Sequence, residues 1–279
     1  MKIGVRAHDF GRHSIESLPQ IIKTAGFDCV QLAPAKAIIG INSFSEITDQ
    51  AIDEIGESFA KHNLEIAILG CYIEPSVIDK EQRLNQVHIF KQNLSFAKRL
   101  GVQFVGTETT HLCPYTTTDD QREESYTRLK DSVLRMIDHA EKENVCVALE
   151  PVADHTLNTP QLAHRLLGSV GSRKLHMIFD PVNMILPTTW KNQNKIYHDF
   201  FALLGRRICA FHAKDTTFSG ETESDEKIWA NIGEGVVNYE LIMPYLKENH
   251  PHLPILREVA QMDSYTKDLE KLQQFIQIQ

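Results

Sequence analysis

Short apolar runs alternate with longer segments of helical spacing along the whole sequence. Several of the runs are apolar at every position, which is typical of parallel strands covered on both faces. The first run is not followed by the GxGxxG turn that a dinucleotide-binding doubly wound sheet would need. Eight such runs predict an α/β protein built as a (β/α)₈ barrel. The predicted strands are Lys2–Ala7, Cys29–Ala33, Glu65–Cys71, Phe104–Thr107, Val145–Glu150, Leu175–Asp180, Ile208–His212 and Pro254–Glu258.

The segments between the strands have apolar residues every three or four positions, as on the buried face of a helix. Gly26 and Gly101 follow two of these segments, where glycine commonly ends a helix. Because no linker or low-complexity stretch interrupts the alternation, we expect one domain over residues 1–279. The predicted helices are Ser14–Ala25, Asp49–His62, Lys80–Leu100, Gln121–Asn144, Pro160–Leu167, Tyr239–Lys247 and Ser264–Ile278.

Composition argues against several classes of protein. The net charge of −8 disfavours a general affinity for nucleic acid or for an anionic membrane. No run approaches the ~20 apolar residues that span a bilayer, and the N-terminal MKIGVRAHDF lacks the apolar stretch of a signal peptide. The five cysteines include no CxxC pair, which fits reduced thiols. We therefore expect a cytoplasmic protein, and the sequence leaves open whether it forms a homo-oligomer.

Four of the predicted strands end in side chains that commonly bind metal ions: Glu150, Asp180, His212 and Glu258. Side chains alternate between the two faces of a strand, so Glu150 shares its face with the small Ala148. The carboxyl ends of all the strands meet at one face of such a barrel, where these four groups can converge. Burying three carboxylates is costly unless a cation meets them, and one divalent metal ion would remove that cost. An ionic network without a metal is the alternative.

Five further polar residues at or beyond strand ends are candidate substrate-binding groups. Glu108 and His8 are in phase with inward-facing positions of the fourth and first strands. The loops beyond the strands carry His155, Asn183 and Lys214, which could contact hydroxyls or an anionic group of a substrate. Each has a structural alternative, such as capping a turn or forming a salt bridge.

Several short segments resemble one known family. They are LEP at 149–151, FDPVN at 179–183, FHAKD at 211–215, IGEG at 232–235 and RE at 257–258. These segments resemble the xylose-isomerase-like TIM barrels, a superfamily of sugar phosphate isomerases and epimerases that also contains inosose and 3-dehydroshikimate dehydratases and endonuclease IV. The resemblance covers essentially the whole chain. It implies that Glu150, Asp180, His212 and Glu258 hold one divalent metal ion.

Two positions depart from the pattern of that superfamily. Asn183 stands where the metal-dependent epimerases and endonuclease IV commonly have a histidine, three residues after the aspartate. In endonuclease IV that histidine helps to hold additional zinc ions, so Asn183 counts against a DNA-repair enzyme. Lys214 and Asp215 stand where epimerases often have an arginine that holds the substrate. The identity of the substrate is therefore left open.

The chemistry that these residues predict is proton transfer next to a carbonyl group. Carboxylates and one imidazole suit Mn²⁺ best, with Mg²⁺, Co²⁺ or Zn²⁺ as alternatives. Such an ion stabilises an enediolate, while Glu150 and Glu258 exchange protons with its two faces. We expect a metal-dependent isomerase or epimerase of a sugar or sugar phosphate. A dehydratase of the inosose or 3-dehydroshikimate type, a DNA-repair endonuclease and a non-catalytic sugar-binding barrel are the alternatives.

The long segment Thr216–Val236 follows the seventh strand and is a candidate lid over the site. Trp190 and Phe218 follow the sixth and seventh strands and are candidate walls of the pocket. Gly233 and Gly235 could offer backbone N–H groups to a phosphate. Whether the sugar carries a phosphate is left open.

Overall fold

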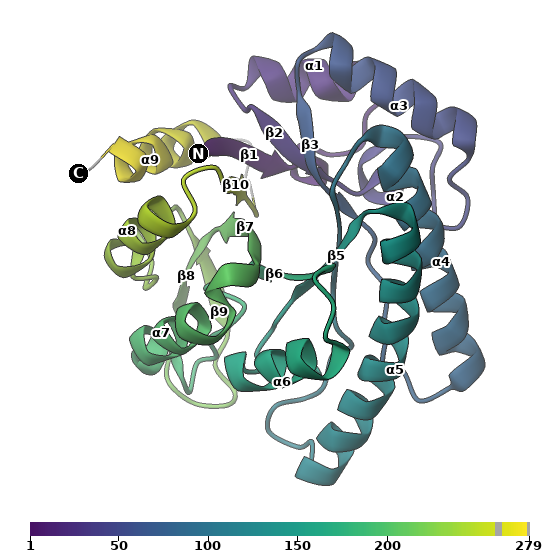
Figure 1. Cartoon of the computed structure of the whole chain (residues 1–279). Coiled ribbons are helices and arrows are strands. Elements are labelled where there is room, and N and C mark those ends of the chain that lie inside the picture. Colours follow the sequence, from purple (N-terminus) through teal and green to yellow (C-terminus); the bar gives the residue numbers. More distant parts are fainter. Residues whose placement is uncertain (260–263, 278–279) are drawn as a thin grey trace.

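The computed structural model describes residues 1–259 and 264–277 and forms a closed barrel of eight parallel strands (Figure 1). The predicted (β/α)₈ barrel is therefore confirmed, and each predicted strand is present to within two residues at either end. In the order in which they pair around the barrel, the strands are β1 (Lys2–Arg6), β10 (Pro254–Arg257), β7 (Ile208–Ala213), β6 (Leu175–Phe179), β5 (Cys146–Glu150), β4 (Phe104–Glu108), β3 (Glu65–Gly70) and β2 (Cys29–Leu32), which closes on β1.

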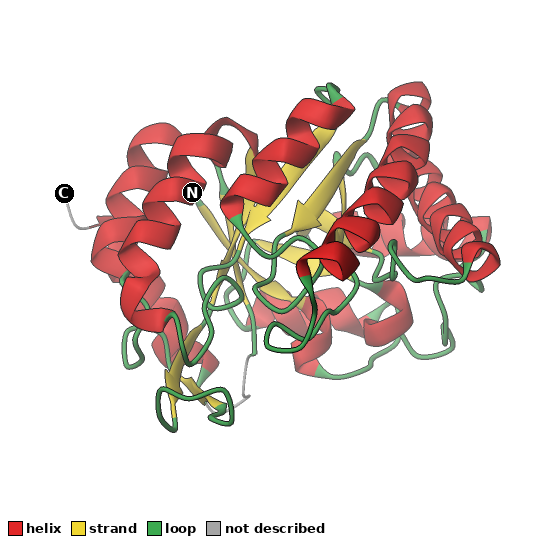
Figure 2. Cartoon of the chain, turned by 90° about the horizontal axis from the view of Figure 1, so that it is seen from below, coloured by secondary structure: helices red, strands yellow, loops and turns green. Residues whose placement is uncertain are grey.

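Helices surround the barrel strands on the outside (Figure 2). Two of them, α2 and α7, were not predicted from the sequence, although the buried residues of α7, namely Tyr197, Phe200, Phe201 and Leu204, recur at helical spacing. The predicted end of the last helix, Ile278, lies outside the described residues. The α-helices are α1 (Ser17–Thr24), α2 (Pro34–Ala37), α3 (Asp49–Lys61), α4 (Lys80–Leu100), α5 (Asp119–Glu143), α6 (Pro160–Val170), α7 (Gln193–Leu204), α8 (Tyr239–Asn249) and α9 (Tyr265–Gln277), and the 3₁₀ helices are η1 (Ala7–Phe10), η2 (Trp190–Asn192) and η3 (Gly205–Arg207).

Small and branched side chains fill the barrel interior. Ile68, Ala148, Ile178, Ala210 and Leu256 belong to one buried cluster that is separate from the core between strands and helices. Such a filled interior leaves room for polar side chains mainly near the carboxyl ends of the strands. No helix in the described part of the chain is both long and apolar enough to cross a membrane.

The segment after β7 forms a two-stranded antiparallel hairpin, β8 (Asp215–Phe218) and β9 (Lys227–Ala230). The buried carboxylate of Asp215 fixes its base by accepting hydrogen bonds from four backbone N–H groups. Gly235 has to be glycine here, because a Cβ atom would lie 2.2 Å from Oδ1 of Asp215. The N–H groups of Gly233 and Gly235 are thus engaged with Asp215, and the interpretation that they are available for a phosphate is wrong. The four donors are Thr216, Gly233, Gly235 and Val237.

A buried ion pair joins the last barrel strand to the last helix. The guanidinium of Arg257, only 2% exposed, donates from Nε to Oδ2 of Asp268 on α9 at 2.7 Å. The other oxygen of Asp268 accepts from the backbone N–H of Ile232 at 2.8 Å. One carboxylate therefore connects β10, α9 and the segment that returns from the hairpin.

We expect Asp268→Ala to lower the free energy of unfolding by about 3–5 kcal/mol, because it leaves the Arg257 guanidinium buried without its counter-charge. Urea denaturation followed by circular dichroism measures this change. Asp131→Ala is the matched control, because it removes an exposed pair with Arg135 within α5 and should have little effect. Equal destabilisation by the two substitutions would contradict the role assigned to Asp268.

Candidate metal centre

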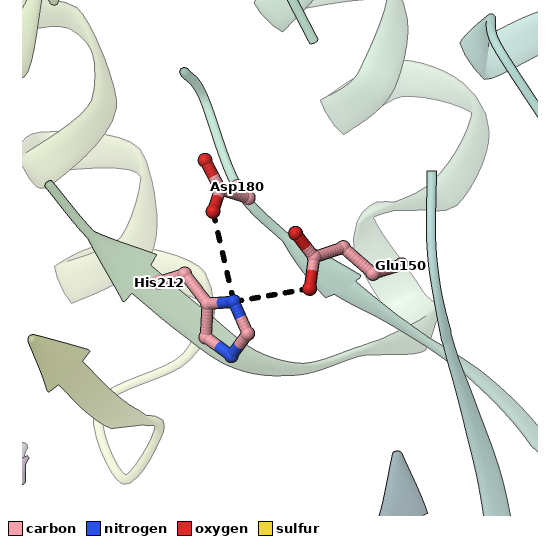
Figure 3. A group of neighbouring side chains, drawn as sticks. All are labelled: Glu150, Asp180 and His212. Carbon is pink, nitrogen blue, oxygen red and sulfur yellow. Dashed lines mark ion pairs between the residues drawn. The ribbon is translucent and has the colours of Figure 1, made fainter. Parts of the chain in front are cut away.

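Glu150, Asp180 and His212 come together at the carboxyl ends of three adjacent strands (Figure 3). One ligand atom of each lies within 4.8 Å of the others, and all three side chains are buried. Nδ1 of His212 is 3.1 Å from Oε2 of Glu150 and 3.6 Å from Oδ2 of Asp180. The three residues therefore converge at the end of the barrel, as predicted.

Glu258 approaches the same histidine from β10. Its Oε1 atom lies 3.3 Å from Nδ1 of His212, and its Oε2 atom accepts a hydrogen bond from Nζ of Lys214 at 3.0 Å. The same ammonium lies 2.7 Å from Oδ2 of Asp180. The same Oε2 atom lies 3.3 Å from Nη1 of Arg6. Glu258 is therefore part of the cluster, and two cations contact the oxygen that does not face His212.

A hydrogen-bonded pair, Gln31 on β2 and Tyr72 just beyond β3, sets the orientation of the His212 ring. Nε2 of His212 lies 2.8 Å from Oε1 of Gln31 on β2, and Nε2 of Gln31 in turn donates to the Tyr72 hydroxyl at 2.9 Å. An amide oxygen only accepts, so Nε2 carries a proton and Nδ1 is left to face the carboxylates. Gln31 and Tyr72 were not predicted as site residues. A glutamine inside the apolar run of β2, only 2% exposed, is the sequence feature that points to this position.

The donor set of the cluster fits one divalent cation. Within the described residues, Nδ1 of His212 is buried without a hydrogen-bond partner although it faces three carboxylates. A metal-binding histidine usually donates a hydrogen bond from one ring nitrogen to a neighbouring oxygen, while its other ring nitrogen binds the ion. Three carboxylates and one imidazole are ligands that suit Mn²⁺, Mg²⁺, Co²⁺ or Zn²⁺.

The pKa values of His212 and Glu258 reflect the negative charge that the three carboxylates concentrate in the cluster. Burial would lower the pKa of His212, but the carboxylates of Glu258 and Glu150 outweigh it and raise this pKa to about 10. Burial would raise the pKa of Glu258, yet His212 and Lys214 hold it well below its usual range. Without a metal, a proton on His212 therefore balances the carboxylates, and a metal ion has to displace that proton.

Asn183 forms hydrogen bonds with two residues of the cluster. Its side-chain amide donates to Oε1 of Glu150 at 2.6 Å, and its backbone N–H donates to Oδ1 of Asp180 at 2.9 Å. Asn183 thus orients two of the candidate ligands, and it leaves Oε2 of Glu150 facing His212. The alternative that the side chain of Asn183 caps the turn is wrong, because the Asp180 carboxylate accepts the N–H group of the turn and the Asn183 amide contacts Glu150.

Two of the other predicted substrate-binding residues line a cavity of ≈ 260 Å³ beside the cluster. Glu108 and His155 line it, with Oε2 of Glu108 4.0 Å from Nε2 of His155. Burial, together with the charges of Glu150 and Glu258, raises the pKa of Glu108 to about 7. His8, which directly follows the predicted first strand, lies on η1 and is edge-on to the ring of Tyr72, one of the lining residues. The cavity is lined by Arg6, Lys36, Tyr72, Ile73, Glu74, Thr107, Glu108, Thr109, His111 and His155.

Trp190 and Phe218, the two aromatic residues predicted to wall the pocket, stack on each other with ring centroids 6.2 Å apart. This contact attaches the β8–β9 hairpin to the barrel. Trp229 on β9 does approach the cluster, since its ring centre lies 5.8 Å from Nζ of Lys214. It was not predicted from the sequence, because its position depends on the hairpin.

The model of the family described as "Xylose isomerase-like TIM barrel" matches residues 19–275 of this sequence. The chain belongs to this family. This match confirms the resemblance of the strand-end motifs to the family. A comparison with curated protein sequences gives no match.

Solved structures with the same architecture cover nearly the whole chain. At identities below 20% their likeness shows the fold alone. Three of them are a D-tagatose 3-epimerase-like protein (18% identity, 99% of this chain and 97% of that one, TM-score 0.79), the IOLI protein with a bound zinc atom (19%, 99% and 95%, 0.70) and the probable 3-DHS dehydratase AsbF from Bacillus anthracis (16%, 98% and 99%, 0.70).

Binding of Mn²⁺ to metal-free protein at neutral pH should release about one proton. Neutral pH lies well below the raised His212 pKa of about 10, so His212 carries a proton that the metal ion has to displace. The proton competes with the metal at every pH below that value, so the affinity for Mn²⁺ should rise as the pH rises. Isothermal titration calorimetry in two buffers of different ionisation enthalpy measures the released proton. His164→Ala, on the exposed part of α6, is the control. Metal binding without proton release would contradict the assignment of His212 as a ligand.

Proposed function

We propose that this protein is a metal-dependent isomerase or epimerase of a sugar or sugar phosphate, working by proton transfer next to a carbonyl group. One observation carries the proposal. Three carboxylates from different strands surround Nδ1 of a single buried histidine at the mouth of the barrel. Such a cluster is expensive to bury unless it serves a cation and a reaction.

Glu150, Asp180, His212 and Glu258 would hold the metal ion. When bound, the ion would supply Lewis-acid stabilisation of the negative charge that develops on the substrate oxygen. The mixture of oxygen ligands and one imidazole favours Mn²⁺ in our proposal, while the zinc in the similar IOLI structure makes Zn²⁺ the first alternative.

Glu150 and Glu258 are the proposed groups that exchange protons with the substrate. They come from β5 and β10, which β6 and β7 separate in the barrel, so they approach the cluster from different sides. A proton removed on one face and returned on the other inverts the carbon between them, which is epimerisation. Return to the neighbouring carbon gives aldose–ketose isomerisation.

The surrounding residues control the charge on these two glutamates. Lys214 and Arg6 keep Glu258 ionised, and the amide of Asn183 holds one oxygen of Glu150 in place. Glu108 and His155, in the adjacent cavity, are the proposed contacts to substrate hydroxyls. Both can donate and accept protons, which suits the two-way hydrogen bonding of a hydroxyl group.

A dehydratase is the second candidate, and Glu108 is the observation that favours it. With a pKa of about 7, its carboxyl group carries a proton in a substantial fraction of molecules at neutral pH. It could protonate a departing hydroxyl group after the same first proton transfer. The likeness to the probable 3-DHS dehydratase AsbF supports considering this reaction.

A screen of ketoses, ketose phosphates, inososes and 3-dehydroshikimate with Mn²⁺ added tests the proposal. Turnover in deuterated water should place deuterium on the carbon next to the carbonyl, because the proton passes through glutamates that exchange with solvent. His212→Ala should lose both the metal and the activity, as measured by elemental analysis and by product formation. Full metal content and activity in His212→Ala would sink the proposal.

Glu150→Gln and Glu258→Gln should each reduce turnover by about 10²–10⁴-fold, because glutamine keeps one oxygen donor but cannot accept the proton. Metal content should fall less than turnover. Glu234→Gln is the control, since Glu234 is exposed and bonds only to Asn231 among the contacts that the structure describes. Retention of activity in either site variant would exclude the two-glutamate mechanism.

A further inference from the structure

One face of the β8–β9 hairpin packs against the barrel. Residues that lie directly opposite each other in an antiparallel pair share a face, so Phe218 and Lys227 share one with Thr216 and Trp229. Phe218 stacks on Trp190 at the start of η2. The face that contains Trp229 is therefore the one that is turned toward the barrel.

A hydrogen bond from Lys227 fixes the position of this face. Its ammonium donates to the backbone carbonyl of Val182 at 2.9 Å, two residues after the candidate ligand Asp180. The base of the hairpin is fixed as well, because the carboxylate of Asp215 accepts the four N–H groups described above. The hairpin is thus tied to the site at both ends.

Trp229 stands out on the barrel-facing side because the residue is 46% exposed. Nζ of Lys214 lies 5.8 Å from the ring centre, and the same ammonium contacts Asp180 and Glu258. A large ring on the packed side of a hairpin is normally covered. Here the ring lies beside the ammonium that contacts two of the candidate ligands, and its neighbour Ile228 (52% exposed) points to the opposite face of the hairpin.

We propose that Trp229 is a substrate-binding residue on which the C–H face of a sugar stacks, so that the site selects carbohydrates that present such a face. This inference rests on the proposed function, because it assigns the substrate class of the same site. The polar groups of the cluster would take the carbonyl and hydroxyl oxygens on one side of the sugar. The indole ring would cover the side that carries hydrogens and would exclude water from the ion cluster.

Kinetics of three variants test this role. Trp229→Ala should raise KM for the sugar by about 2- to 10-fold with kcat little changed, which is the range of a lost aromatic contact. Trp229→Phe should restore most of the affinity, because phenylalanine keeps an aromatic face. Ile228→Ala is the matched control on the opposite face of the same strand and should behave as the parent. Metal content, measured by elemental analysis, should be equal in all three.

Fluorescence gives a readout that does not need turnover. The chain has two tryptophans, so Trp190→Phe leaves Trp229 as the sole tryptophan emitter. Titration of this variant with D-tagatose, D-fructose and their phosphates should change the emission saturably, whereas glycerol, which has no sugar carbon chain to stack, should not.

The outcomes separate the two proposals. A saturable emission change without turnover of any sugar would support the stacking role and overturn the proposed reaction. Turnover with the same KM in Trp229→Ala and Ile228→Ala would overturn the stacking role and leave the proposed reaction in place. Loss of metal from Trp229→Ala would also overturn it, because the ring would then be a part of the metal centre's structure.

Discussion

The mutual repulsion of buried carboxylates is the constraint on which this structure depends. Two like charges about 4 Å apart cost about 4 kcal/mol at the effective dielectric of a protein site. Glu150, Asp180 and Glu258 all face Nδ1 of one histidine, and in the described part of the chain Lys214 and Arg6 are the cations paired with them. A fold that keeps this arrangement has to hold the carboxylates rigidly and has to supply positive charge. The closed barrel meets the first requirement, since each group ends a strand that is paired on both sides.

The period-two alternation of a strand explains how the positive charge and the hairpin are arranged together. Lys214 and Asp215 follow β7 directly, so their side chains point in opposite directions. Lys214 turns toward the carboxylates, while Asp215 turns into the backbone N–H groups of the returning loop. The pair thus links the charge balance of the site to the position of the hairpin. Trp229 comes close to Lys214 because Asp215 fixes the base of the strand pair that carries it.

Local sequence patterns predicted the strands and the inward-facing residues at their ends. The apolar runs and their periods located the eight strands, and the phase of each run placed Glu150, Asp180 and His212 on the inside. What the patterns did not predict depends on contacts between distant residues. Gln31 orients a histidine that is 181 positions away, and no spacing rule connects the two. Trp229 required the register of a hairpin, whereas Trp190 and Phe218 were nearer to the strand ends in sequence but pack on each other.

The contacts of Asn183 bear on how many metal ions this cluster can serve. Its amide nitrogen donates a hydrogen bond to Glu150. This N–H group has no lone pair with which to bind a metal ion. A histidine in the same place could bind a second ion, whereas Asn183 instead stiffens a ligand of the first. The imidazole of His155 faces Glu108 in the adjacent cavity and has its pKa lowered by burial, so it is suited to contact a neutral hydroxyl. Arg6 and Lys36 line the same cavity and add two cationic hydrogen-bond donors. The site therefore combines the donors for one ion with a cavity that offers both neutral and cationic contacts to the proposed substrate.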